Sequence, residues 1–505
     1  MSETPFSLDH NQAQLLLSRI TELLHNYPLE SSVALTATSL GAYTFKHLIT
    51  PSQYPNIDGP PSSSFAFGNL YDIYSGQAVA FHDGLQDKYG SVSKVKGMFG
   101  KESLFVSDPR FLHEVLVKGV DITFHHPNFV YDITRISFGP GLLSSTGELH
   151  KAQRKMLNPV FTAKHMKSLI PIFDKIAQTM KGSIIKEIGT MPGKEVDMLQ
   201  WCGAAALELI GQAGLGHTFG VLEGVDSDYS RAVKEYLPAL FKVMPLKAFF
   251  PLFHNLKPTA LQRKLADWAP MPYVRKMKEV VDVQDQQVLQ AQKILEQKKK
   301  NLNNGPATAG EESHDIMSIL LKANMEAEEK DRLPEDQLLG QMNTLIFAGH
   351  ETTRQVLKLD SWAYPVKGKN GEEVREIRVR KGTTIHVSLK EANRSEETWG
   401  QDADVFRPER WLEQLPASVS DAKTSGVYSS MMTFSAGPRA CIGFKFSLLE
   451  LKIILSMLVK SFKFEPGHTP TVWLMGATMV PYVAGTKDLL EEGKHPTLPL
   501  KVSIL

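Results

Sequence analysis

Cysteine is scarce in this chain, and an excess of charge of one sign is absent. The 505 residues contain two cysteines, Cys202 and Cys441, which excludes a disulfide framework, and we expect both thiols to be reduced. The 56 basic residues are balanced by 55 acidic ones, so the sequence gives no basic footprint for a nucleic-acid partner. The chain is nevertheless long enough to bury a large core.

A long apolar run is also lacking. A membrane-spanning helix needs about 20 mostly apolar residues, whereas the uncharged stretch 31–45 is short and rich in Ser and Thr. Residues 11–27 have the apolar spacing of an amphipathic helix. We therefore predict that residues 1–50 form an N-terminal amphipathic segment and at most a weak membrane anchor, and that 51–505 form one folded domain.

What the sequence does contain indicates a mainly α fold with small β-sheets. Strand-like runs occur at 91–97 and 103–108, and helical patterns follow. One long helix is predicted from Pro334 to about Leu357, with acidic residues in its first turn. Gly349 lies inside it at a cost of about 1 kcal/mol relative to Ala. This cost indicates that something approaches the helix backbone closely there.

The sequence around Cys441, FSAGPRACIG at 434–443, places a thiol in a Gly-rich loop before a predicted helix. The dipole at a helix amino end lowers a thiol's pKa and favours the thiolate, which is the form that binds metal. A free cysteine is also often a buried apolar residue. A cysteine hydrolase would use the same thiolate, but it needs a histidine base that no local signature supplies.

His150 and Arg154 are four residues apart and therefore share one face of a predicted helix. Charged residues in such a pair are typical of a solvated face. Together with Arg439, however, the two side chains could bind an anion. Both alternatives stay open on these residues alone.

The loop at 434–443 resembles the heme-binding loop of the cytochrome P-450 family, F-x-x-G-x-R-x-C-x-G. The matching positions are Phe434, Gly437, Arg439, Cys441 and Gly443. Four other segments are similar to parts of that family: 55–70 to the hinge after the membrane anchor, 147–161 to the helix that holds the heme propionates, 348–353 to the oxygen-activating segment, and 406–411 to the segment before the heme loop. Taken together, these segments are most similar to those of fungal microsomal members of the family.

The resemblance implies roles for individual residues. Cys441 would be the thiolate ligand of heme iron, and Arg439, His150 and Arg154 would pair with the propionates. In the long helix, Ala348 and Gly349 would leave room for oxygen. Glu351 and Thr352 would relay protons to the oxygen that the cofactor activates.

The resemblance also implies a function and partners. The enzyme would be a heme-dependent monooxygenase that inserts one oxygen atom from O2 into an apolar small molecule, such as a terpenoid or another fungal secondary metabolite. An NADPH-dependent flavoprotein reductase would supply the electrons. The protein would lie at the endoplasmic reticulum membrane, with its catalytic domain in the cytosol and in contact with the membrane surface.

One expected part of the family pattern is missing, the helix that carries E-x-x-R. A literal match at 372–375 lies in a turn that leads into a strand, and Thr352 and Cys441 are 89 positions apart, which is short for the family. We predict that the fold is incomplete between about Thr353 and Arg354. Arg410 would then lose its buried carboxylate partner, at a cost of about 3–5 kcal/mol.

Two hypotheses follow from the missing helix. The sequence is either a shortened gene model or splice form of a working monooxygenase, or a catalytically impaired remnant that holds heme poorly.

Overall fold

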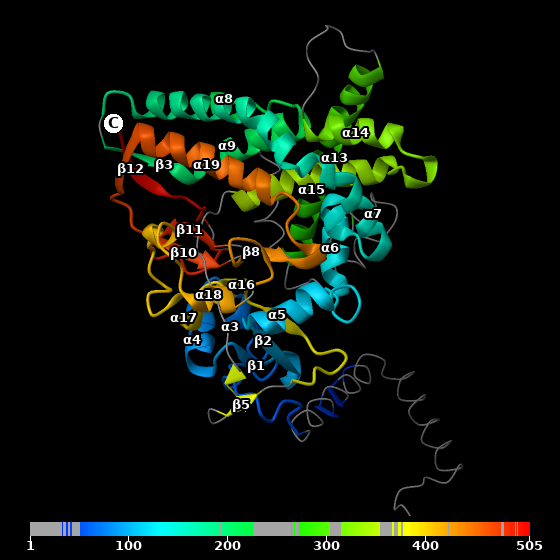
Figure 1. The fold of residues 1–505 in the computed structure, drawn as a ribbon, viewed down its shortest axis with the longest axis vertical. Helices are drawn as coiled ribbons and strands as arrows, with labels where there is room; N and C mark the ends of the chain where they lie inside the picture. Colours follow the sequence, from blue (N-terminus) through cyan, green and yellow to red (C-terminus); the bar gives the residue numbers. More distant parts are fainter. Residues whose placement is uncertain are drawn as a thin grey trace, which may run out of the picture. The chain divides into compact units, whose positions relative to one another are not determined.

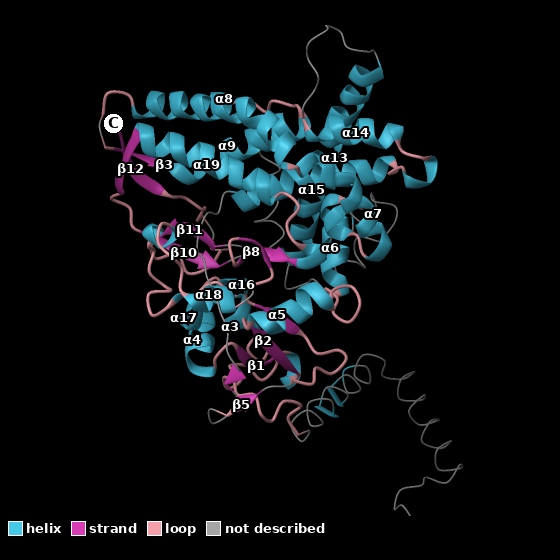
Figure 2. Cartoon of the chain, in the orientation of Figure 1, coloured by secondary structure: helices cyan, strands magenta, loops and turns pink. Residues whose placement is uncertain are grey.

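The structure is a computed structural model in which helices predominate over strands (Figure 1, Figure 2). This confirms the predicted fold class. Residues 1–50 lie outside the described residues apart from isolated positions. No helix in the described part of the chain has the length and apolar character needed to cross a bilayer. The described ranges are 51–191, 193–225, 272–303, 315–353, 366–367, 372–374, 377–422, 424–475, 479–489, 491 and 493–505, with a few isolated residues besides.

The chain forms two compact units rather than a single contact cluster. The smaller unit contains the described residues of 1–73, 81–106 and 365–388. Its three-stranded sheet pairs β1 (Val92–Lys96) antiparallel with β2 (Glu102–Val106), and β2 parallel with β6 (Ile385–Val387). These strands confirm the two predicted early strands. The core beneath them consists of Ile73, Leu85, Val95 and Phe105.

A short hairpin in the same unit contains the literal E-x-x-R match. Strand β4 (Val366–Lys367) pairs with β5 (Glu373–Val374). Glu373 is thus a strand residue, as the sequence predicted, so the match is not the missing helix. Two helices precede β1 in the sequence, α3 (Leu70–Tyr74) and α4 (Ala78–Tyr89).

The larger unit, residues 74–80, 107–364 and 389–505, contains the remaining helices. The α-helices are α5 (Pro109–His113), α6 (Asn128–Phe138), α7 (Gly147–Leu157), α8 (Ala163–Ile188), α9 (Met198–Leu209), α13 (Pro272–Asn303), α14 (Ile316–Glu326), α15 (Glu335–Thr353), α16 (Leu389–Ala392), α17 (Glu396–Trp399), α18 (Ala417–Asp421) and α19 (Phe444–Ser461).

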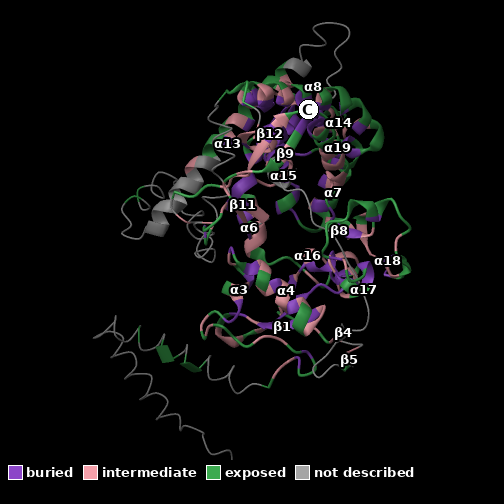
Figure 3. Cartoon of the chain, turned by 90° about the vertical axis from the view of Figure 1, so that its left-hand side faces the viewer, coloured by how far each residue is buried: buried purple, intermediate pink, exposed green. Residues whose placement is uncertain are grey.

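The core of the larger unit includes buried residues of α8, α9, α14, α15 and α19, of which α8 and α19 run side by side (Figure 1). Helix α8 buries a stripe with a spacing of three or four residues, at positions 166, 169, 173, 176, 180 and 184. Its Phe173 ring meets Phe446 of α19 edge-on, with 4.9 Å between centroids. Figure 3 shows that the helices of the larger unit carry both buried and exposed residues. This packing anchors α19, whose amino end carries the loop with Cys441.

Helix α9 continues as a π-helical segment, η5 (Ile210–Leu215), and α15 contacts both. The wide π turn brings Ile210 against α15. A Cβ atom at Gly349 would lie 2.8 Å from Ile210 Cγ1. The predicted close approach at Gly349 therefore exists, and the partner is a side chain of this chain.

The strands of the larger unit form three small antiparallel sheets. In the first, β12 (Pro499–Ile504) pairs with both β3 (Lys194–Asp197) and β9 (Phe462–Pro466). The other two are the hairpins β10 (Thr471–Met475) with β11 (Met479–Val483), and β7 (Gly426–Tyr428) with β8 (Met431–Ala436).

Candidate functional site

The candidate site is built on the turn between β8 and α19. Strand β8 ends at Ala436, the single 3-10 turn η11 (Gly437–Arg439) follows, and Cys441 precedes the first turn of α19. The Cys441 amide donates to the Phe434 carbonyl over 2.9 Å and closes the loop. The thiol is thereby fixed at the amino end of an 18-residue helix, as the sequence predicted.

Two glycines of this loop have different surroundings. Gly437 has φ +67°, and a Cβ atom there would lie 2.3 Å from the Leu116 carbonyl oxygen, so the loop needs glycine at that position. At Gly443 the nearest atom to an added Cβ is Phe161 Cε1, at an ordinary 3.7 Å. An alanine at Gly443 would make only this ordinary contact, so packing within the described chain does not require glycine there.

Helix α7 carries the predicted basic residues and is held in place by α15. Gln153 of α7 donates to Gln337 of α15 over 3.0 Å and to the Pro140 carbonyl over 2.9 Å. Just before α7, the Leu142 amide donates to Gln341 of α15 over 3.2 Å. These bonds fix the orientation of α7 in the larger unit.

Two reciprocal hydrogen bonds join the cysteine loop to α7 and to Ser145, which lies two residues before α7. Arg154 donates from Nη1 to the Ala440 carbonyl over 2.8 Å, and Arg439 donates from Nη1 to the Ser145 carbonyl over 2.7 Å. His150 is 3 % exposed. The interpretation of His150 and Arg154 as part of a solvent-exposed helix face is therefore wrong. The face of α7 that carries them packs inward toward the loop.

A charged contact between His150 and a propionate requires a protonated imidazole, but the structure favours the neutral form. Burial, together with the charges of Arg439 and Arg154, lowers the pKa of His150 to about 4. In the protein itself the imidazole is neutral near pH 7. It can donate one N–H to an anion, whereas the positive charge comes from the two arginines.

The thiol of Cys441 also corrects the sequence prediction. Its pKa is raised, because desolvation by the surrounding protein outweighs the Gly443 amide and the charge of Arg154, which both lower it. The helix end is present, but its effect is the smaller one. A thiolate here needs a further positive partner, and a coordinated iron would be one.

The predicted oxygen-side residues lie in the last two turns of α15. Ala348 and Gly349 are half-buried, and the missing side chain of Gly349 faces Ile210. The side chains of Glu351 and Thr352 lie outside the described residues. Their proton-relay role stays a prediction.

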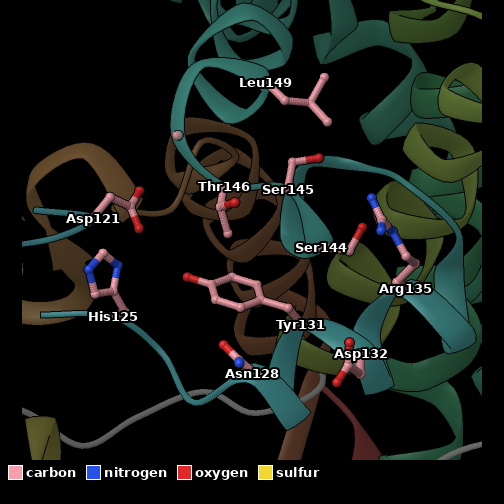
Figure 4. Close-up of a pocket in the computed structure, with 11 residues that line it drawn as sticks. Asp121, His125, Asn128, Tyr131, Asp132, Arg135, Ser144, Ser145, Thr146 and Leu149 are labelled. Carbon is pink, nitrogen blue, oxygen red and sulfur yellow. The ribbon is translucent and has the colours of Figure 1, made fainter. Parts of the chain in front are cut away.

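Sequence reasoning missed Asp121, which contacts Arg439. Asp121 Oδ2 accepts from Arg439 Nε over 3.0 Å and from Nη2 over 2.8 Å. No sequence motif marks this aspartate, since it lies 318 positions from its partner. It borders a pocket of about 620 Å³ (Figure 4). The pocket is lined by Asp121, His125, Asn128, Tyr131, Asp132, Arg135, Ser144, Ser145, Thr146, Gly147 and Leu149.

These residues fit a flat iron cofactor with two carboxylates. A single exposed thiol at a helix end can bind the metal, and two guanidinium groups and a neutral imidazole lie close by. When bound, heme supplies the activation of O2. Cys441 would hold its iron, and Arg439, Arg154 and His150 would hold its propionates.

The fold and this site define a class, the mostly helical heme-thiolate proteins. The profile of the cytochrome P-450 family matches residues 59–359 and 367–481. Cytochrome P-450 monooxygenase 91 of Postia placenta is 35% identical over 89% of this chain and 94% of its own length. Monooxygenase 81 of the same fungus is 33% identical over 95% of this chain and 98% of its own length. A ganoderic acid synthetase of Ganoderma lucidum is 30% identical over 94% of this chain and 99% of its own. The chain belongs to the cytochrome P-450 family and is a heme-dependent monooxygenase by descent.

The family match is interrupted between residues 359 and 367, shortly after α15 ends at Thr353. The alignment with monooxygenase 91 spans 521 positions, but 89% of 505 residues is about 449, so about 72 aligned positions have no residue of this chain. For monooxygenase 81, 548 positions contain about 480 residues of this chain, which leaves about 68.

Proposed function

We propose that this chain derives from a monooxygenase that inserts one atom of O2 into an apolar small molecule of the terpenoid class. An NADPH-dependent flavoprotein reductase supplies the electrons. The observation that carries the proposal is the loop of Cys441, which is tied to α7 by Arg154 and Arg439. The similarity to a ganoderic acid synthetase supports the substrate class.

Each predicted residue has one task in this proposal. Arg439 and Arg154 neutralise and orient the propionates, while His150 donates a neutral N–H. Glu351 and Thr352 hold and move protons at the carboxyl end of α15. The catalytic domain works in the cytosol at the surface of the endoplasmic reticulum membrane.

The carbon monoxide spectrum of the reduced, full-length protein tests this function. Thiolate-ligated heme gives a red-shifted Soret band, and we expect Cys441→Ala to abolish it. Cys202→Ala is the matched control and keeps the band. A spectrum without heme absorbance after heme supplementation, together with Cys441-dependent hydrolysis, would instead support a cysteine hydrolase. Against that alternative, Cys441 has no hydrogen bond to a histidine among the described residues, and its thiol pKa is raised.

A second candidate is a catalytically impaired remnant. The interrupted family match and the roughly 70 aligned positions without a residue of this chain support the predicted absence of the E-x-x-R segment. Transcript sequencing across codons 345–360 distinguishes the two. A longer message supports a shortened gene model of a working enzyme, and an uninterrupted short message supports the remnant.

A further inference from the structure

Asp121 is the residue outside the predicted site that makes the most direct contact with it. Both of its bonds from Arg439 end on Oδ2, and the two side chains are 18% and 11% exposed. The other oxygen, Oδ1, is buried and has no hydrogen-bond partner among the residues that the structure describes. A buried carboxylate oxygen without a partner is costly, so the position of Asp121 is set by what it does for Arg439.

Within the described part of the chain, the contacts of Arg439 leave two N–H groups of its guanidinium group unused. The group has five N–H donors in a fixed plane. Three of them are used, by Asp121 at Nε and Nη2 and by the Ser145 carbonyl at Nη1. The Tyr131 ring covers one face, 5.7 Å from the guanidinium carbon. Two N–H groups remain, one on each terminal nitrogen, and such a pair matches one carboxylate.

The backbone holds Asp121 in a conformation that costs free energy. Its φ is +59°, the left-handed region that non-glycine residues seldom occupy. The Asp121 amide donates to the Phe124 carbonyl over 2.9 Å, and the Gly119 carbonyl accepts from the amides of residues 122, 123 and 124. Strain that is held in this way is a mark of a functional position.

We propose that Asp121 is a positioning residue for heme. It fixes Arg439 so that the unused edge of the guanidinium group faces a propionate, and it adds a negative charge beside that edge of the cofactor. This inference rests on the proposed function, since it requires that the chain binds heme. Asp121 does not touch the cofactor itself.

The test compares Asp121→Asn with Asp132→Asn in the heme-loaded, full-length protein. Asn tolerates positive φ and keeps the shape of the side chain, and the exposed Asp132 lines the same pocket. Heme transfer to excess apomyoglobin is followed by absorbance. We expect Asp121→Asn to release heme about 10- to 100-fold faster, the range for outer-shell partners of a metal site. The reduction potential of the iron should rise in Asp121→Asn and stay constant in Asp132→Asn.

A second variant and a double-mutant cycle separate positioning from folding. Asp121→Gly fits the positive φ without strain and should show the same fast release. In an Arg439→Lys background, which lacks the two-donor edge, Asp121→Asn should add little. Equal release from Asp121→Asn, Asp132→Asn and wild type, or slower release from Asp121→Asn, overturns this inference and leaves the proposed function standing. A wild-type protein that shows no carbon monoxide band overturns both.

Discussion

The guanidinium group of Arg410 lies 3.1 Å from the carboxylate of Asp402. Arg410 is buried, donates to the Trp399 carbonyl over 2.8 Å and to the Asp402 carbonyl over 2.7 Å, and covers the Trp399 ring. The sequence predicted that this arginine would lose its carboxylate partner together with the E-x-x-R helix. That loss stays a prediction, but Arg410 is not left without a carboxylate, because Asp402 lies eight positions away and supplies one that is 36% exposed.

Replacing Arg410 by Leu should lower the free energy of unfolding by about 3 kcal/mol, since a buried carbonyl group at Trp399 and a partly buried one at Asp402 then lose their donor. The measurement is urea-induced unfolding followed by tryptophan fluorescence. Arg407→Leu is the matched control, because Arg407 binds the same Asp402 carboxylate at 3.0 Å but is 44% exposed. It should cost under about 1 kcal/mol. Equal losses in the two variants would show that the burial and the carbonyl contacts of Arg410 add nothing beyond the ion pair with Asp402 that both arginines share.

The low pKa of His150 predicts a pH dependence of stability. The native state keeps the imidazole neutral down to about pH 4, whereas the unfolded chain binds a proton near pH 6.5. The unfolded state therefore binds more protons between these values, and stability falls as the pH falls from about 6.5 to 4. The difference between the two pKa values of His150 corresponds to about 3 kcal/mol in the free energy of unfolding. Above pH 6.5 this contribution is constant.

His150→Gln should flatten that decline in unfolding experiments at a series of pH values. Other groups titrate in the same range, so the difference between variant and wild type is the quantity of interest. His495→Gln, at an exposed histidine, should follow the wild-type curve. Parallel curves for His150→Gln and wild type would contradict a buried neutral imidazole.

The elements that could be predicted from the sequence are those whose structure depends on residues close together in the chain. Strands β1 and β2, helix α19 and the placement of Cys441 at its amino end follow from local spacing and from Gly and Pro positions. The long helix begins at Glu335, next to the predicted Pro334, because the acidic first turn suits its amino end.

The pairings across long sequence separations were not predictable. Asp121 with Arg439 and Asp402 with Arg410 follow no motif, and only the packed chain brings each pair together. The pKa of Cys441 was predicted in the wrong direction for the same reason. The helix end, which lowers the thiol pKa, can be predicted from the sequence. The desolvation that raises the pKa is the larger effect, and it depends on the tertiary structure.

Two loop glycines should respond differently to alanine. Gly437→Ala places a methyl group at positive φ against the Leu116 carbonyl and should lower stability by about 1–3 kcal/mol. Gly443→Ala meets only an ordinary contact with Phe161, so the protein should fold as before. If heme approaches Gly443 closely, Gly443→Ala should nevertheless lose heme faster in the apomyoglobin assay. Unchanged heme retention would exclude close approach of the cofactor at Gly443.

The proposed proton relay predicts an effect of Thr352 on coupling. Thr352→Ala should keep consuming NADPH and O2 while the product formed per NADPH falls, because the hydroxyl no longer holds a proton donor in place. Thr353→Ala is the neighbouring control in the same helix. Oxygen uptake and product are measured together in the reductase-supported reaction. Equal coupling in both variants would count against the role of Thr352.

Gly349 has two proposed reasons to be glycine, and one double-mutant cycle separates them. Alanine gains about 1 kcal/mol of helix propensity, but its methyl group would lie 2.8 Å from Ile210 Cγ1, and overpacking typically costs about 1–3 kcal/mol. We therefore expect Gly349→Ala to destabilise the wild type but to cost less, or to stabilise, in an Ile210→Ala background. The coupling should be measured by unfolding of the heme-free protein, in which room for oxygen plays no part. If Gly349→Ala changes the free energy of unfolding equally in both backgrounds, packing against Ile210 is not the reason for glycine at this position. Room for oxygen beside α15 would then explain it.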